Sequence, residues 1–172
     1  MFVKFSNNSG FTFIELIMVM GIIGLLAGFV SFSFPASLRR ARDTRRQSDL
    51  KQWQTSLETY GNKNNGIYYA STTAIQPNGN VLCQVLYPAE YPPCPGPADP
   101  RTGQTACLRA TGTFTACNYQ YESNAGGTTY VLFSPLEAPS DTTKPYFIIC
   151  SVGVTGYGTA ANVANTDGVC PI

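Results

Sequence analysis

The sequence contains no histidine and few charged residues. Of its 172 residues only 12% are charged, with eleven Lys and Arg against ten Asp and Glu, about half the ~25% of an average soluble domain. Without histidine the chain cannot build a Ser-His-Asp or Cys-His nucleophile or a His-ligated metal site. A net charge of +1 argues against a nucleic-acid binder that works by phosphate neutralisation. The 44% of hydrophobic residues is too high for a disordered chain, so we expect a core.

The apolar residues are concentrated near the N-terminus. Leu16 to Phe34 form an unbroken run of 19 residues without a charge. As a helix this run spans about 28 Å, close to the ~30 Å of a bilayer core. It predicts a membrane helix, with a signal peptide, a plain anchor and a core helix as the alternatives. The run is too long for the apolar region of a signal peptide, and so uniformly apolar a core helix is rare in a small domain.

Glu15 stands directly before the apolar run. A carboxylate in hydrocarbon costs on the order of 2.5–3.5 kcal/mol, so it needs a partner. The residues around it, from Gly10 to Leu16, read GFTFIEL. This segment resembles the type III signal of the type IV pilin superfamily, which includes pilins, type II secretion pseudopilins and competence pilins; Phe13 replaces the usual Leu. The resemblance extends over residues 4–70 and implies a pilin fold.

The resemblance also implies how the N-terminus is processed and used. A prepilin peptidase would remove the leader, residues 1–10, by cutting after Gly10, and would methylate the new amine of Phe11. Glycine at the cleaved position lets the backbone approach an active site closely. In the family, Glu15 of one subunit pairs with the Phe11 amine of its neighbour, which sets the register of assembly. An intramolecular pair and a carboxylate that snorkels to the interface are the alternatives.

Three glycines interrupt the apolar run, and a proline follows it. Gly21, Gly24 and Gly28 are spaced three and four apart, so they share one helix face. They predict either close approach of another helix or a place where the helix extends on assembly, and Pro35 predicts a kink. Glycine and proline are also simply common in membrane helices, and the sequence does not separate these interpretations.

Basic residues gather just after the proline. This basic collar consists of Arg39, Arg40, Arg42, Arg45 and Arg46. Taken alone, the positive-inside rule places the collar in the cytoplasm, whereas the peptidase signal and the cysteine-rich part that follows place it outside. We hypothesise that the collar meets acidic groups of neighbouring subunits or lipid headgroups, with a solvated helix face as the alternative. Asp43 and Asp49 are also spaced for intrahelical pairs with the arginines.

An apolar stripe at helical spacing follows the collar: Leu50, Trp53, Leu57 and Tyr60. It predicts a helix that packs on a C-terminal sheet rather than a ligand site. We therefore expect a membrane and filament-core helix over residues 11–38 and an amphipathic helix over residues 39–60. Gly61 and the Asn65-Gly66 pair are expected to end it.

Residues 61–172 are rich in Gly, Pro, Thr and Tyr and are predicted to form a globular head. Residues 116–123, 128–134 and 146–152 are strand candidates, and residues 124–127 are a plausible hairpin connection between the first two. The fold class that follows is α+β, with a long N-terminal helix packed on a small antiparallel sheet of at least three strands.

All six cysteines lie in the head, and no CxxC pair occurs among them. An even number in an exported domain favours three disulfides, while a zinc site is not expected without histidine. Six cysteines allow fifteen pairings. The preferred pairing is sequential, since each bridge then closes a short loop: Cys83–Cys94, Cys107–Cys117 and Cys150–Cys170. Reduced, buried thiols are the alternative. No cofactor is expected, although Asp167 is a candidate for a calcium loop against an ordinary polar turn.

We expect a structural subunit and not an enzyme: a major pilin that polymerises through its N-terminal helix into a type IV pilus filament. Its partners would be its own copies, the prepilin peptidase, an inner-membrane assembly platform and, before assembly, membrane lipid. Direct nucleic-acid binding is not expected. The location would be a single-pass membrane protein with its head outside the cytoplasm, and then an extracellular filament. A type II secretion major pseudopilin and a minor or competence pilin are the alternatives.

Overall fold

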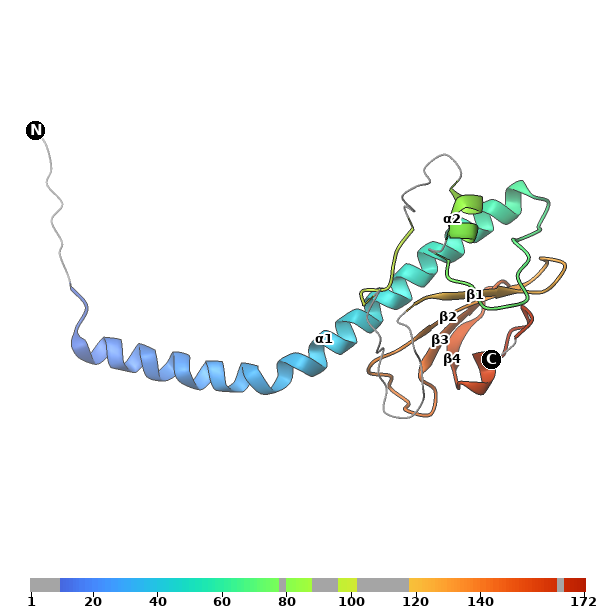
Figure 1. Ribbon diagram of the computed structural model, residues 1–172. Coiled ribbons are helices and arrows are strands. Elements are labelled where there is room, and N and C mark those ends of the chain that lie inside the picture. The colour runs from blue at the N-terminus through green and yellow to red at the C-terminus, as the bar shows by residue number, and fades with distance from the viewer. Residues whose placement is uncertain (1–9, 78–79, 88–95, 102–117, 164–165) are drawn as a thin grey trace, which may run out of the picture. The chain divides into compact units, whose positions relative to one another are not determined.

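A computed structural model of the chain describes residues 10–77, 80–87, 96–101, 118–163 and 166–172, with residues 30–33, 80 and 81 described by their backbone alone. Its elements are α1 (Phe13–Lys63), α2 (Asn80–Leu86), β1 (Gln120–Ser123), β2 (Tyr130–Pro135), β3 (Tyr146–Cys150), β4 (Thr155–Gly158) and the 3₁₀ helix η1 (Ala161–Val163). The chain divides into two units, Met1–Leu38 and Arg39–Ile172. The predicted α+β class is confirmed, since a long helix precedes an antiparallel sheet (Figure 1).

In the first unit the described part of α1 has exposed side chains on all sides. Every side chain described between Phe13 and Leu38 is exposed. Taken singly, no helix in the described part of the chain is long and apolar enough for a membrane crossing. The bent pair formed by Phe13–Phe29 and Phe34–Lys63 has the length and composition for one.

The C-terminal end of α1 differs from the prediction in one respect. The helix runs through Gly61, which does not end it. This glycine lies close to Tyr68, since a Cβ there would be 2.6 Å from Cε1 of that ring. The Asn65-Gly66 pair does end the helix, as predicted. Asn65 and Gly66 have positive φ angles of 57° and 81°, the left-handed conformation of helix C-caps, and the Gly66 amide donates to the Gly61 carbonyl at 2.8 Å.

In the second unit the four strands form one antiparallel sheet in the order β1-β2-β3-β4. The three predicted strands are present, although each is shorter than or shifted from its prediction. Residues 116 and 117 of the first prediction lie outside the described residues. Three elements were missed, namely β4, whose sequence TGYG contains two glycines, the seven-residue helix α2 and the 3₁₀ helix η1.

The core lies where α1 crosses one face of the sheet (Figure 1). Leu50, Trp53 and Leu57 of the predicted stripe are fully buried, whereas Tyr60 is half-buried and outside the core. The two inner strands, β2 and β3, are buried along their whole length. Alternate residues of β2 enter different clusters: Leu132 packs with the α1 stripe, and Val131 packs on the opposite face with Val163.

The stripe makes a direct prediction about stability. Leu57→Ala removes a buried side chain from the contact between helix and sheet and should destabilise the second unit by about 2–5 kcal/mol. Thr55→Ala, on the exposed side of the same helix, should stay within about 0.5 kcal/mol of the unchanged chain. Denaturant unfolding of the detergent-solubilised chain measures both, and equal losses in the two variants would contradict this packing.

Candidate assembly site and its support

The first turn of α1 is closed by a reciprocal cap between Thr12 and Glu15. The Glu15 carboxylate atom Oε2 accepts hydrogen bonds from the Thr12 amide at 2.9 Å and from the Thr12 hydroxyl at 2.8 Å. The Glu15 amide donates back to the Thr12 hydroxyl at 3.3 Å. This is a capping box, which satisfies helix amides that otherwise have no partner. The spacing T-x-x-E carried this signal, and the sequence analysis missed it.

The remaining predicted residues of the N-terminal segment lie on an open surface. Gly10 and Phe11 are both exposed, and Phe11 retains 91% of its surface. Apart from the adjacent residues and the helix's own backbone, no atom in the described part of the chain lies within 4 Å of the position of a Cβ on any of three glycines of α1: Gly21, Gly24 and Gly28. Pro35 lies inside α1 and is exposed. The pairing of Glu15 with the Phe11 amine of a neighbour is a contact between copies and stays a prediction.

The structure divides the basic collar into two groups. Arg39 and Arg40 are exposed, and so is Arg45, whose Nε lies 3.7 Å from Asp49. Arg46 is fully buried and Arg42 is partly buried. The collar is therefore not one uniform basic surface.

Arg46 is the centre of a buried ion-pair network. Its guanidinium reaches Asp99 through two bonds, Nε–Oδ2 at 2.7 Å and Nη2–Oδ1 at 3.1 Å. Nη1 donates to Asp43 at 2.9 Å, and Nη2 donates to Glu137 at 2.8 Å. These carboxylates come from α1, from the loop before the sheet and from the segment after β2. One arginine thus connects three separate parts of the second unit, and a planar guanidinium suits such multiple bonding.

Two further contacts tie the segment after β2 to α1. Arg42 holds Glu137 with two bonds, from Nε at 2.9 Å and from Nη2 at 2.5 Å. The Asp43 carboxylate accepts the backbone amides of Glu137 and Ala138 at 2.8 and 2.7 Å. Asp43 therefore holds the backbone at Glu137, the carboxylate that both Arg42 and Arg46 bind.

The loop that carries Asp99 is held on the same helix by Trp53. The indole Nε1 donates to the Pro97 carbonyl at 2.9 Å. Gly96 lies directly on the indole ring, because a Cβ there would be 2.1 Å from Cη2 of Trp53. Any larger residue at this position would displace the loop from the tryptophan.

Burial and charge act in opposite directions on these groups. Burial alone would raise the pKa of Glu137, but the hydrogen bonds from Arg42 and Arg46 outweigh it and lower that pKa to about 2. Burial alone would lower the pKa of Arg46, but Asp99 and Glu137 raise it above its ordinary value. Glu137 and Arg46 are therefore both charged at neutral pH. Sequence reasoning missed Asp99 and Glu137, since neither carries a local signal.

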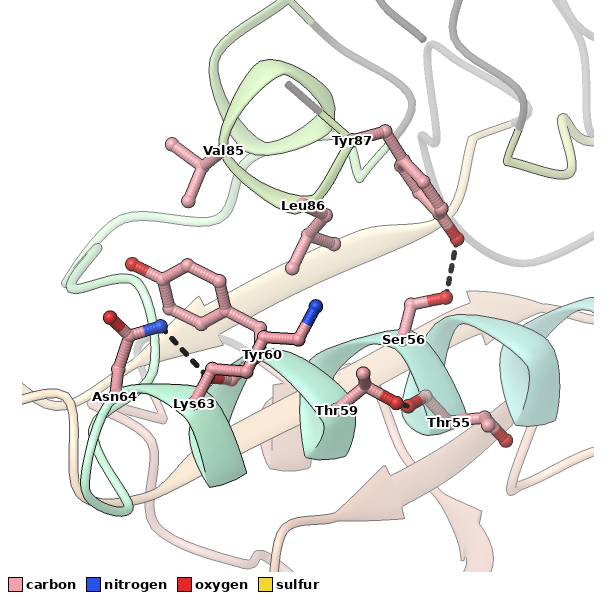
Figure 2. A pocket seen from close by; sticks show the side chains of 9 residues that line it. All are labelled: Thr55, Ser56, Thr59, Tyr60, Lys63, Asn64, Val85, Leu86 and Tyr87. Atoms are coloured by element: carbon pink, nitrogen blue, oxygen red, sulfur yellow. Dashed lines mark hydrogen bonds between the residues drawn. The ribbon is translucent and has the colours of Figure 1, made fainter. Parts of the chain in front are cut away.

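Tyr60 of the predicted stripe lines a pocket of about 440 Å³ between the end of α1 and α2 (Figure 2). Figure 2 shows α1 residues facing α2 residues across it, and Ser56 is hydrogen-bonded to Tyr87. Other hydroxyls at its wall serve the helix itself, as Thr59 donates to the Thr55 carbonyl at 2.8 Å. Tyr60 has the helical spacing of the stripe, but its side chain lines this pocket and is not part of the core.

The cysteines are placed in part. Cys150 and Cys170 form a disulfide with a Cα–Cα distance of 5.5 Å, which fastens the C-terminal segment to β3. Cys83 in α2 is also disulfide-bonded, but Cys94, Cys107 and Cys117 lie outside the described residues. The proposed pairs Cys83–Cys94 and Cys107–Cys117 therefore stay predictions.

The calcium candidate Asp167 lies in a tight turn with a φ of 46°. Its backbone amide donates to Glu122 Oε1 at 3.0 Å. Among the residues that the structure describes, no group of three or more Cys, Asp or Glu side chains is arranged to hold a metal ion.

Comparison with known proteins gives one match. Residues 5–31 match the family model described as the prokaryotic N-terminal methylation motif, the signature of type IV prepilins and pseudopilins. The search of curated proteins and the search of solved structures gave no match. The match covers the predicted cleavage position after Gly10, the Thr12–Glu15 cap and most of the apolar run.

The buried network predicts a sharp contrast between neighbouring arginines. Arg46→Met leaves three carboxylates without their common counter-charge and should cost about 3–5 kcal/mol of unfolding free energy. Arg45→Met changes an exposed residue and should cost less than about 1 kcal/mol. Denaturant unfolding at neutral pH compares them, and a small effect of Arg46→Met would show that the network does not hold the second unit together.

Glu137 also predicts a pH dependence. Its pKa is about 2 in the folded chain against an ordinary 4.5, so the unfolded chain takes up its proton first as the pH falls. The stability that Glu137 supplies is thus complete above pH 4.5 and is lost between pH 4.5 and 2. In thermal melts the difference between the unchanged chain and Glu137→Gln should shrink across that window. The control Asp167→Asn, at an exposed carboxylate, should not alter this profile, and a constant difference down to pH 2 would refute the assignment.

Proposed function

Because the chain carries the signature of type IV prepilins and pseudopilins, we propose that it is the major pilin of a type IV pilus. In this role it has no catalytic activity of its own. It polymerises through its N-terminal helix into a filament whose surface is formed by copies of the head.

The exposed apolar surface of α1 is the observation that carries this proposal. Between Phe13 and Phe29 each large hydrophobic side chain keeps more than half of its surface exposed, in a stretch where only Glu15 is charged. So large an apolar surface is not stable in water and requires a cover. Membrane lipid supplies the cover before assembly, and the same helices of neighbouring copies supply it in the filament.

Glu15 gives the helix contact its register. Both hydrogen bonds that the Glu15 carboxylate accepts in the capping box end on Oε2, so the cap is compatible with a second interaction at Oε1. After cleavage behind Gly10, the new Phe11 amine of an adjacent copy is a cation that can approach this oxygen. In surroundings of low dielectric, an isolated charge is costly and pairing offsets part of that cost. Subunits therefore stack where amine and carboxylate meet.

The same segment explains the partners of the precursor. Gly10 and Phe11 are exposed and hence accessible to a membrane prepilin peptidase, which removes the leader and methylates Phe11. An inner-membrane platform then assembles the mature subunits. The precursor is a single-pass membrane protein with its head outside the cytoplasm, and the product is an extracellular filament.

A type II secretion major pseudopilin is the second candidate, because the methylation motif is common to both classes. A pseudopilin would be inserted, cleaved and methylated in the same way as a pilin. The two differ in the product, since a pseudopilus drives secretion and a pilus extends from the cell surface.

Two substitutions of Glu15 test the role of its charge in assembly, with and without the cap. Glu15→Gln keeps a side-chain acceptor for the cap but removes the charge, and Glu15→Leu removes both. Both variants should lower the filament yield by about tenfold or more, because the register pair is lost. Leader cleavage is followed in parallel by mass spectrometry of the subunit.

Asp141→Asn, a change at an exposed carboxylate of the head, is the control and should leave the yield unchanged. A normal yield of filaments from cleaved Glu15→Gln would mean that the charge of Glu15 does not direct assembly.

A further inference from the structure

We propose that Arg39 and Arg40 bind the headgroups of anionic phospholipids while the chain is anchored in a membrane before assembly. This inference rests on the membrane-anchored precursor of the proposed function. It assigns a specific ligand class to the part of the basic collar that the head leaves unoccupied.

Arg39 and Arg40 are available for a partner outside the chain. Both are exposed, and within the described ranges neither has a carboxylate oxygen within 4 Å. The next arginine, Arg42, is already bound to Glu137 by two hydrogen bonds. The head thus neutralises the later part of the collar and not its beginning.

The spacing along the helix places these two arginines at headgroup depth. No charged residue occurs between Glu15 and Arg39, an interval of 23 uncharged residues that ends with the exposed apolar side chain of Leu38. At ~1.5 Å per residue these 23 residues extend for about 35 Å, against about 30 Å for a bilayer core. A helix that keeps this interval in hydrocarbon brings Arg39 and Arg40 to the level of the lipid phosphates.

The chemistry of the two side chains fits a phosphate surface. A guanidinium presents paired N–H donors that match two phosphate oxygens. Each basic residue near an anionic lipid surface strengthens the association by about fivefold. Two adjacent arginines with no acidic neighbour in contact can both act in this way.

A second copy of the chain is a poorer match for these arginines. Most acidic side chains in the described part of the chain are buried or already hydrogen-bonded within the head. The exposed ones are few, and they are Glu15, Asp141 and Asp167. A lipid surface offers a dense layer of anions, so lipid is the partner favoured by charge complementarity.

Native mass spectrometry tests the proposal on the unassembled full chain. The chain is placed singly in nanodiscs of phosphatidylcholine and phosphatidylglycerol at a four-to-one ratio, and the lipids retained on release are counted. The unchanged chain should retain phosphatidylglycerol well above its share of the disc. Arg39→Gln/Arg40→Gln should lower this enrichment by about 25-fold if each arginine contributes about fivefold. Lys144→Gln, an exposed cation of the head, should retain it.

Two results would overturn the proposal. One is retention of the two lipids in proportion to their share of the disc, and the other is unchanged enrichment in the double variant. If the double variant keeps its lipids but forms fewer filaments, the arginines serve a contact between copies instead. An unchanged melting temperature verifies that the double variant is folded. The assay contains no filament, so its failure is distinct from a failure of the proposed assembly role, which the Glu15 variants report.

Discussion

The apolar side chains described in the first part of α1 are all exposed, and this single constraint organises the molecule. A helix whose surface is apolar on all sides is stable only in lipid or against other apolar helices. The chain keeps charge out of the interval from Leu16 to Leu38 and closes the start of the helix with the Thr12–Glu15 cap. The first unit is therefore suited to exchange one apolar environment for another, as the proposed insertion and polymerisation would require.

The second unit solves a different problem, namely how to fasten a small sheet to a helix. The apolar contact of Leu50, Trp53 and Leu57 supplies the hydrophobic part. The Arg46 network makes this contact specific. If any of its ion pairs is not formed, a charge is left buried and unpaired. Since the desolvation of these groups is costly, the network is better understood as fixing the position of the loops at Asp99 and Glu137 than as adding net stability.

Local sequence signals predicted local features well. The period of the apolar stripe predicted three buried residues of α1, and the Asn65-Gly66 pair predicted where the helix ends, because only certain residues adopt a positive φ readily. Arg46 was not recognised as buried, since its partners Asp99 and Glu137 are 53 and 91 residues away and a single sequence does not encode such distant pairs visibly. The strand β4 was missed because glycines weaken a strand pattern, and it forms through pairing with β3. The Thr12–Glu15 cap, by contrast, was readable from the sequence.

The most direct test of the account is the composition of filaments sheared from cells that express the chain. Electron microscopy identifies the filaments, and mass spectrometry of their subunits gives the first residue and its modification. The account predicts that this chain is the dominant subunit and that it begins at a methylated Phe11 without residues 1–10. Surface filaments that lack the chain, or that contain it with its leader intact, would contradict the claim that its apolar helix is processed to build a pilus.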